Sequence, residues 1–303
     1  MKILVIGGSG LVGSHVLRAA ALAGHAPVGT YRKFPLPGLV AFDGAVKQAA
    51  TALLDENKPD AVVHAAGWTW VDGCEDDPAR AFEENARQPE CLARLCQARG
   101  IRFAYFSTSY VFDGSRGPYT EEDAPNPINV YSRSKWEGEQ RVQAAAKGMA
   151  LIPRVVTVYG AEARQKNFAW QVWRALEEGR TMRVPSDQVS NPTYAADIAC
   201  WLVALLAKGS RGIWNLASPL LDWTRPRWAG ALVSAFETAG IRRHTAFNIE
   251  EVPTIALGQR GLRPLNAGMA TAKLARLNLP ATEFVKSVEE MVRQDREWYS
   301  RRS

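Results

Sequence analysis

The sequence predicts an α/β fold, with a doubly wound parallel sheet in the first half of the chain and a smaller mixed α/β part in the second. Three observations lead to this. Short apolar runs alternate with helical patterns, the apolar runs contain few polar residues, and the first run ends in glycines. Strands of a parallel sheet that helices cover on both faces have this nearly continuous apolar character. The 303 residues are enough for one or two domains.

The elements of the first half alternate in order along the chain. The expected strands are short apolar runs bounded by turn residues, at 2–6, 27–31, 60–66, 101–107 and 150–158. The expected helices carry apolar residues at helical spacing, at 11–23, 45–57, 78–100 and 130–147. Each helix therefore connects one strand to the next, as a parallel sheet requires.

The regular alternation of strands and helices ends at about residue 159, after which proline and glycine interrupt the predicted elements more often. One further strand is expected at 212–216, and helices are expected at 167–179, 195–208, 227–239 and 283–299. We interpret residues 1–160 as one domain and 161–303 as a smaller one, some of whose segments return to the main sheet.

Charge and composition exclude several classes of protein. The net charge is +6, but Lys and Arg are scattered rather than gathered in the stripe that nucleic-acid binding needs, so no nucleic-acid partner is expected. A positive field still favours an anionic ligand such as a nucleotide. No apolar run approaches about 18 residues, so no membrane span is expected. The four cysteines lack C-x-x-C spacing, and a reduced cytoplasmic protein is the simplest interpretation.

The first strand is followed by the motif G-G-S-G-L-V-G, in which Gly7, Gly10 and Gly13 are spaced as in a dinucleotide-binding loop. Glycine at these positions permits a tight turn and the close approach of a pyrophosphate, and the next helix points its free N–H groups at the phosphates. Because the motif lies between a strand and a helix, it predicts a Rossmann-type, NAD(P)-binding domain in residues 1–160.

The residues after the second strand bear on the choice of cofactor. NAD-preferring sites usually place an acid there, whereas this sequence has Arg32 and Lys33. Two cations suit a 2′-phosphate, so NADPH is favoured and NADH is the alternative. The two residues could equally belong to an exposed loop.

A candidate catalytic group follows from Tyr131 and Lys135, which share one face of an expected helix. A nearby ammonium lowers the pKa of a phenol, and such a tyrosine can donate a proton to a carbonyl oxygen while hydride reaches the carbon. Thr108, at the end of an apolar strand, can hydrogen-bond the same oxygen. The three residues after a glycine loop predict a reductase of a keto group.

These segments resemble the extended short-chain dehydrogenases/reductases, and more narrowly the dTDP-4-dehydrorhamnose reductase family. The matching stretches are GGSGLVGS, KPDAVVHAAGWTWVDGCEDDP, FSTSYVFDG, PNPINVYSRSKWEGE, DQVSNPTYAADIA and LRPLNAGMATAKL. The resemblance implies a Rossmann domain, a C-terminal substrate domain, and NADPH- or NADH-dependent reduction of a 4-keto-6-deoxy nucleotide sugar. It also implies catalytic roles for Thr108, Tyr131 and Lys135, with Lys135 on the nicotinamide ribose.

The resemblance assigns further residues one by one. Those expected at the cofactor, besides the glycines, Tyr131 and Lys135, are Leu11, Val12, Arg32, Asp43, Ala65, Ala66 and Thr69. Those expected at the nucleotide sugar, where Arg263 would help to hold the diphosphate, are Ser109, Tyr110, Asn167, Gln188 and Arg263.

Two positions depart from the family pattern. Ser109 replaces an acid that contacts the sugar, and Thr157 stands where a tryptophan is frequent. We therefore expect a nucleotide sugar other than the rhamnose precursor to be preferred. Trp68 and Trp70 are added after the expected strand at 60–66, either as packing residues or as a wall of the sugar pocket.

No metal site is expected, since the four histidines show no ligand spacing. His15 and His64 are interpreted as structural, and the acidic run at 121–123 as an exposed turn, with a metal between subunits as the lesser alternative. A homodimer is a further alternative. Two other functions remain open: a nucleotide-sugar epimerase or non-sugar carbonyl reductase on the same fold, and a non-catalytic NADP-binding regulatory subunit.

Overall fold

The computed structural model describes residues 1–240 and 246–299. Its main sheet is parallel throughout, and β6 (Ser107–Thr108) extends it beside β7. In order across the sheet, its other strands are β12 (Gly212–Leu216), β7 (Leu151–Val155), β5 (Arg102–Tyr105), β4 (Ala61–His64), β1 (Lys2–Ile6), β2 (Ala26–Tyr31) and β3 (Val40–Ala41). The strand order reverses direction at β1, which is the arrangement of a doubly wound sheet.

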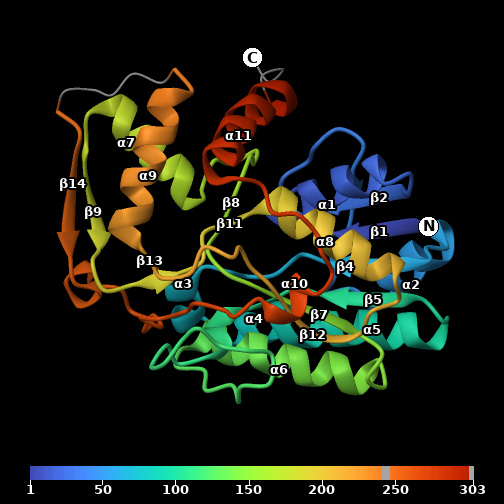
Figure 1. Cartoon of the computed structure of the whole chain (residues 1–303). Coiled ribbons are helices and arrows are strands. Elements are labelled where there is room, and N and C mark those ends of the chain that lie inside the picture. The colour runs from blue at the N-terminus through green and yellow to red at the C-terminus, as the bar shows by residue number, and fades with distance from the viewer. Residues whose placement is uncertain (241–245, 300–303) are drawn as a thin grey trace.

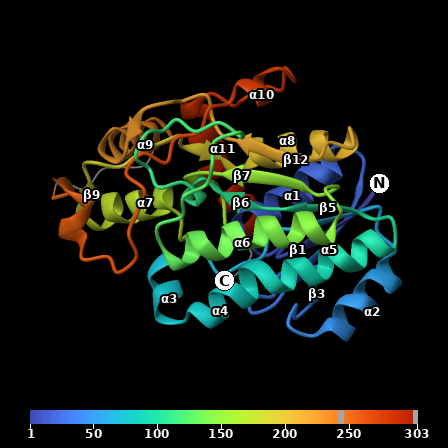
Figure 2. The same cartoon turned by 90° about the horizontal axis from the view of Figure 1, so that it is seen from below.

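Helices cover both faces of this sheet (Figures 1 and 2). On one face, α1 (Leu11–Leu22) packs against α8 (Ala195–Ala207), and both bury apolar side chains against β1, β4 and β5. On the other face lie α2 (Lys47–Asn57), α5 (Gln88–Ala98) and α6 (Val130–Ala145). The predicted fold class is therefore confirmed, because the continuous apolar strands are covered on both sides.

The second half of the chain forms a smaller core of its own, rich in aromatic residues. It is built from α7 (Phe168–Glu178), α9 (Arg225–Thr238), α11 (Phe284–Tyr299), β9 (Thr181–Pro185) and β14 (Asn248–Val252). The last two pair in parallel. Figure 1 shows this part beside one end of the main sheet. β12 and α8 also come from the second half, yet they complete the main sheet and one of its faces.

The remaining elements are short and lie between these. They are α3 (Val71–Asp76), α10 (Ala272–Ala275), the 3-10 turns at Ser109–Val111 and Thr254–Leu257, and the short strands β8 (Val158–Tyr159), β10 (Val189–Ser190), β11 (Thr193–Tyr194) and β13 (Trp223–Thr224). Among the described residues, no helix has the length and apolar composition that crossing a bilayer requires.

One helix differs from its prediction. The expected helix at 78–100 is α4 (Pro78–Phe82) and α5, joined by a π-helical turn at Glu83–Arg87. The wider turn directs Glu84 and Asn85 inward, and both are buried. Asn85 Oδ1 accepts a hydrogen bond from the Trp68 N–H at 2.9 Å, so the turn anchors the loop after β4. Such turns inside helices are frequent at functional sites.

His15 and His64 are both buried, in agreement with a structural role. Burial is the main reason why the pKa of His64 is lowered to about 3 and that of His15 to about 4. Both therefore stay neutral in the folded protein at pH values where the unfolded chain binds protons. Stability must then fall as the pH decreases below 6.5.

We expect each histidine to remove about 1.4 kcal/mol of unfolding free energy per pH unit between about 6 and 4. Denaturant unfolding at pH 7 and pH 5 measures the loss. His64→Leu should make the decline shallower, because the neutral side chain no longer takes up a proton on unfolding. A decline as steep as that of the wild type would contradict this account.

Candidate active site

The glycine loop after β1 forms a cradle that only glycine fits. Gly7 has φ +86°, and its carbonyl oxygen accepts a hydrogen bond from the Gly10 N–H at 3.0 Å. A Cβ on Gly13 would lie 2.2 Å from that oxygen, and one on Gly7 would lie 2.9 Å from the Ala66 nitrogen. The loop backbone is thus packed tightly between α1 and the end of β4. This close approach is what a dinucleotide pyrophosphate requires.

Helix α1 begins directly after this loop, with Leu11 and Val12 in its first turn. The described first turn carries no acidic residue, and no side chain caps it. Its free N–H groups and positive dipole end therefore suit phosphate. Ala65 and Ala66 follow β4 beside the loop and are half-buried, and Thr69 is exposed further along. The residues present fit a dinucleotide here, as predicted.

Arg32 follows β2 directly, where the ribose of such a cofactor would lie, but its charge is not free. Its Nη2 lies 2.9 Å from Glu84 Oε2, and Arg80 Nε lies 2.8 Å from the other oxygen of the same carboxylate. The Arg32 side chain keeps 36% of its surface exposed, so it can still reach a ligand. Asp43 is exposed after β3 and accepts a hydrogen bond from the Ala45 N–H at 3.1 Å. Sequence reasoning missed Glu84, because it lies 52 residues from Arg32.

Thr108, Tyr131 and Lys135 come together as predicted, at the ends of β6 and α6. All three are buried, and the Thr108 hydroxyl lies close enough to Tyr131 to lower the pKa of its phenol. Thr108 Oγ1 also accepts from the Tyr110 N–H at 3.2 Å. The Lys135 ammonium donates to the Phe106 carbonyl oxygen at 2.6 Å and lies 4.0 Å from the centre of the Tyr105 ring.

Helix α6 holds this group because its first turn is well capped. Asn129 accepts a hydrogen bond from the Ser132 N–H, and the Ser132 hydroxyl accepts one from the Asn129 N–H, so the two form a capping box. Further along, Asn85 Nδ2 donates to Ser134 Oγ at 3.0 Å and ties the helix to the π-helical turn. Tyr131 and Lys135 are therefore presented by a fixed helix.

The pKa of Tyr131 differs in direction from the expectation. Burial raises the pKa of this phenol above its ordinary value, and the nearby Thr108 hydroxyl only partly offsets that effect. Burial likewise lowers the pKa of Lys135 to about 7. An ammonium that is itself desolvated carries its charge only in part at neutral pH, so Tyr131 remains protonated. A neutral phenol is the form that can donate a proton.

Two of the residues expected at the sugar, Ser109 and Tyr110, directly follow Thr108 in the chain. The Tyr110 ring meets the Tyr131 ring edge-on, with centroids 6.2 Å apart. Ser109 is fully buried, and its hydroxyl has no hydrogen-bond partner among the described residues. Thr157, at φ +46°, donates from its hydroxyl to Ser190 Oγ at 2.8 Å. The Ser109 hydroxyl is thus buried without a partner among the described residues, whereas that of Thr157 is held by Ser190.

Asn167, Gln188 and Arg263 lie on separate elements. Asn167 is the N-cap residue of α7 and donates to the Gly160 carbonyl oxygen at 2.9 Å, while its own Oδ1 has no partner within the described parts of the chain. Gln188 donates to Thr254 Oγ1 at 3.1 Å. Arg263 Nη1 lies 2.9 Å from Asp72 Oδ1.

That ion pair compensates the charge of Arg263. Burial opposes ionisation of Asp72, but hydrogen bonds from Arg263 and the Gly261 N–H hold its pKa below the ordinary value. The charge of Arg263 is therefore already balanced by Asp72, a pairing that the sequence did not reveal.

Trp68 and Trp70 flank Gly73 on α3, where a Cβ would lie 2.3 Å from the Trp70 ring. Trp68 packs against Val130 and Tyr131, and the Arg80 guanidinium lies 4.0 Å from its ring centre. Trp68 is therefore a packing residue, whereas Trp70 is 60% exposed and is not part of that packing.

Within residues 1–240 and 246–299, no three His, Cys, Asp or Glu side chains are placed to hold a metal ion. Glu121 instead accepts a hydrogen bond from the Asn215 N–H at 2.9 Å.

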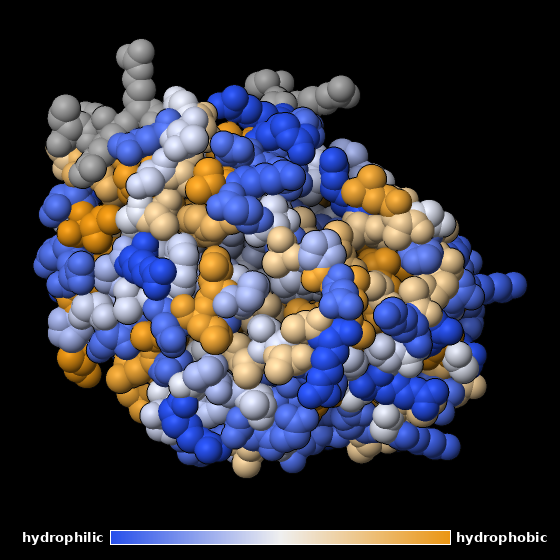
Figure 3. Space-filling view, in the orientation of Figure 1, coloured by the Kyte–Doolittle hydropathy of each residue, from blue (hydrophilic) through white to orange (hydrophobic). Residues whose placement is uncertain are grey.

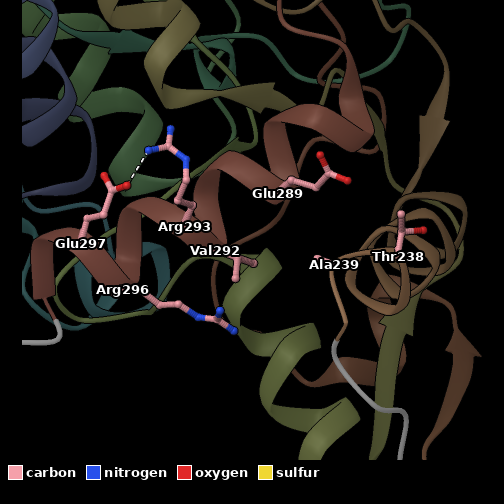
Figure 4. Close-up of a pocket in the computed structure, with 7 residues that line it drawn as sticks. All are labelled: Thr238, Ala239, Glu289, Val292, Arg293, Arg296 and Glu297. Carbon is pink, nitrogen blue, oxygen red and sulfur yellow. Dashed lines mark hydrogen bonds and ion pairs between the residues drawn. The ribbon is translucent and has the colours of Figure 1, made fainter.

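A surface pocket of about 340 Å³ lies between the ends of α9 and α11 and is lined by charged residues of α11 (Figure 4). None of its lining residues belongs to the catalytic group. On the face in Figure 3, hydrophilic and apolar residues are interspersed.

Comparisons with known proteins agree with this geometry. Residues 1–297 match the family described as the RmlD substrate binding domain. The chain is 32% identical over 286 residues to a dTDP-4-dehydrorhamnose reductase of Burkholderia thailandensis, which covers 90% of this chain and 92% of that protein. It is 38% identical over 226 residues to a probable low-salt glycan biosynthesis reductase of Haloferax volcanii, covering 72% and 75%.

Solved structures show the same similarity. A dTDP-4-dehydrorhamnose reductase of Bacillus anthracis, solved in complex with NADP, has a TM-score of 0.84 and 25% identity, and the match covers 97% of this chain and 99% of that one. The family expected from the sequence is thus confirmed. The chain belongs to the RmlD substrate binding domain family.

Proposed function

We propose that this protein is an NADPH-dependent reductase of the keto group of a nucleotide-linked sugar, with 4-keto-6-deoxy sugars as the substrate class. The observation that carries the proposal is the contact of Thr108 with a protonated Tyr131 beside Lys135, next to a loop that fits a dinucleotide. Relatives named as reductases of dTDP-linked sugars support the substrate class, and the relative solved with NADP supports the cofactor.

The chain's own residues supply the proton and the orientation. Gly7, Gly10 and Gly13 would hold the pyrophosphate with Leu11 and Val12, and Asp43, Ala65, Ala66 and Thr69 would line the remainder of the cofactor. When bound, NADPH supplies hydride to the carbonyl carbon. Thr108 orients the carbonyl oxygen, and Tyr131 transfers its phenolic proton to that oxygen, which becomes a hydroxyl group. Lys135 then stabilises the tyrosinate and holds the ribose.

The assignment to domains follows from the same proposal. Residues 1–160 would hold the cofactor, and residues 161–303 would hold the sugar through Asn167, Gln188 and Arg263, with Ser109 and Tyr110 facing it from the first part. A homodimer and a cytoplasmic location stay predictions, which light scattering and cell fractionation measure.

The test is a set of dTDP-, UDP-, GDP- and CDP-linked 4-keto-6-deoxy sugars, with NADPH oxidation and the alcohol product both measured. We expect one hydroxyl group formed for each NADPH oxidised. Because Ser109 and Thr157 replace the acid and the tryptophan that the resemblance implies, the rhamnose precursor should not have the highest kcat/KM. Absence of turnover with every sugar, or recovery of tightly held NAD from the purified protein, would overturn the reductase proposal in favour of a binding protein or an epimerase, respectively.

The position of Arg32 directly after β2 predicts how the protein distinguishes NADPH from NADH. Arg32→Ala should weaken NADPH by about tenfold or more, since a charge-assisted hydrogen bond to the 2′-phosphate contributes about 1.5–3 kcal/mol. NADH, which lacks this phosphate, should bind nearly as before. Fluorescence titration with both cofactors measures the two effects. Arg87→Ala is the control, because Arg87 is exposed and pairs only with Glu83 among the described acids. Equal losses for both cofactors would refute the role of Arg32.

A further inference from the structure

Arg225 is the first residue of α9, and its guanidinium lies over two aromatic rings. Its guanidinium carbon lies 5.1 Å from the centre of the Phe168 ring and 5.2 Å from that of Trp228. These two rings stack with centroids 4.6 Å apart and so form an aromatic floor beneath the charge. The Tyr110 side chain lies near Arg225 and favours the charged form of the guanidinium.

Within the described chain, no carboxylate lies at ion-pair distance from Arg225, and this sets it apart from Arg154, Arg32 and Arg263. Arg154 is bound by both oxygens of Glu139, at 2.9 and 2.7 Å. Arg32 pairs with Glu84, and Arg263 pairs with Asp72. Burial lowers the pKa of Arg225 against the opposing influence of Tyr110, so the cost of holding a charge there is not offset by an acid.

The position of Arg225 connects it to the reacting group. Tyr110 lies close enough to Arg225 to favour its charged form, and the Tyr110 ring lies edge-on against Tyr131. The Arg225 backbone N–H donates to the carbonyl oxygen of Gln188 at 3.1 Å, and Phe168 directly follows Asn167. Arg225 therefore lies among residues expected at the nucleotide sugar, separated from Tyr131 by a single aromatic side chain.

We propose that Arg225 binds the diphosphate of the nucleotide-sugar substrate. This inference rests on the proposed function, because it takes the reacting carbonyl to lie at Tyr131 and Thr108. In a 4-keto nucleotide sugar, one pyranose ring separates the carbonyl at C4 from the diphosphate on C1. One tyrosine ring separates Tyr131 from Arg225, so the two spans correspond.

The chemistry of the side chain suits this ligand. A guanidinium offers a rigid fork of donors that matches two phosphate oxygens, and its flat face stays stacked on the aromatic floor. The two rings hold the orientation of the fork before a ligand arrives. The ligand would supply the negative charge that Asp72 supplies to Arg263. A carboxylate on the sugar has the same charge, but in a hexuronic sugar it lies only one ring atom beyond C4, too near Tyr131 for Arg225.

The experiment measures nucleotide binding by calorimetry on the NADP-saturated protein. The probes are dTDP, UDP, GDP and CDP, each beside its own nucleoside. Arg225→Met removes the charge and keeps the length of the side chain. Arg227→Met is the matched control, since Arg227 lies two residues further on the same helix, is exposed, and also stacks on an aromatic ring, that of Trp223, at 4.7 Å.

We expect Arg225→Met to weaken the tightest-binding diphosphate by about ten- to a hundredfold and its nucleoside by less than about twofold. Arg227→Met should change neither by more than about twofold. NADP affinity and thermal unfolding show whether each variant is folded. If Arg225→Met does not fold, Arg225→Gln takes its place with the same expectation.

Three results would overturn the inference. Arg225→Met could bind the diphosphate as tightly as the Arg227→Met control does, it could lose diphosphate and nucleoside affinity equally, or the wild type could bind none of the four diphosphates. The first two leave the proposed function intact if the wild type still reduces a 4-keto nucleotide sugar. Turnover of the wild type alone decides the proposed function, so the two failures are distinguishable.

Discussion

Tyr131→Phe is expected to lower kcat by about 10²–10⁴ while NADPH affinity remains close to that of the wild type. Phenylalanine keeps the ring that packs against Val130 and Trp68 but removes the proton donor. The magnitude is the usual contribution of one general acid. Because burial raises the pKa of Tyr131, the phenol is protonated throughout the neutral range and its loss cannot be offset by raising the proton concentration. Single-turnover NADPH oxidation measures the chemical step directly.

The matched control for this variant is Tyr194→Phe. Tyr194 is also a buried tyrosine whose hydroxyl is hydrogen-bonded, to Gln294 Oε1 at 3.1 Å, but it lies in the core of the second part of the chain. Its substitution should lower stability by about 1 kcal/mol and leave kcat within about twofold. If Tyr131→Phe retains more than about a tenth of the activity, the assigned acid is wrong.

The main sheet was predictable because its strands are apolar on both faces and its helices are regular. The pair β9 and β14 was missed, since Arg183, Glu250 and Glu251 give both strands a polar, half-exposed character. These strands form by pairing across more than sixty residues, which local periodicity does not reveal. The π-helical turn at Glu83–Arg87 has no local signal either, because its inward residues are held by Trp68 and Arg32.

In the candidate site, too, contacts between residues close in the sequence were predictable, whereas contacts between distant residues were not. Tyr131 and Lys135 are four residues apart on one helix, so the sequence was sufficient to place them together. The acid partner of Arg263 lies 191 residues away, and the aromatic floor of Arg225 comes from two helices. The expected lowering of the Tyr131 pKa was wrong because burial of both groups, which spacing does not show, outweighs their attraction.

Gly13→Ala tests the cofactor cradle by geometry alone. The added methyl group would lie 2.2 Å from the Gly7 carbonyl oxygen, and both atoms belong to rigid backbone, so the loop must move. Overpacking of this kind costs about 1–3 kcal/mol of stability. Because the displaced oxygen accepts the Gly10 hydrogen bond that shapes the cradle, NADPH affinity should also fall by at least about tenfold.

Gly230→Ala separates this clash from the general effect of placing alanine in a helix. Gly230 lies within α9, has no atom within 4 Å of an added Cβ, and is exposed. Alanine there should raise stability by about 0.5–1 kcal/mol, because a helical glycine is more flexible in the unfolded chain, and it should leave NADPH affinity unchanged. Thermal unfolding and NADPH titration of both variants measure the two effects. An affinity for Gly13→Ala equal to that of Gly230→Ala would mean that the cofactor does not depend on this loop, and the dinucleotide site would then have to lie elsewhere.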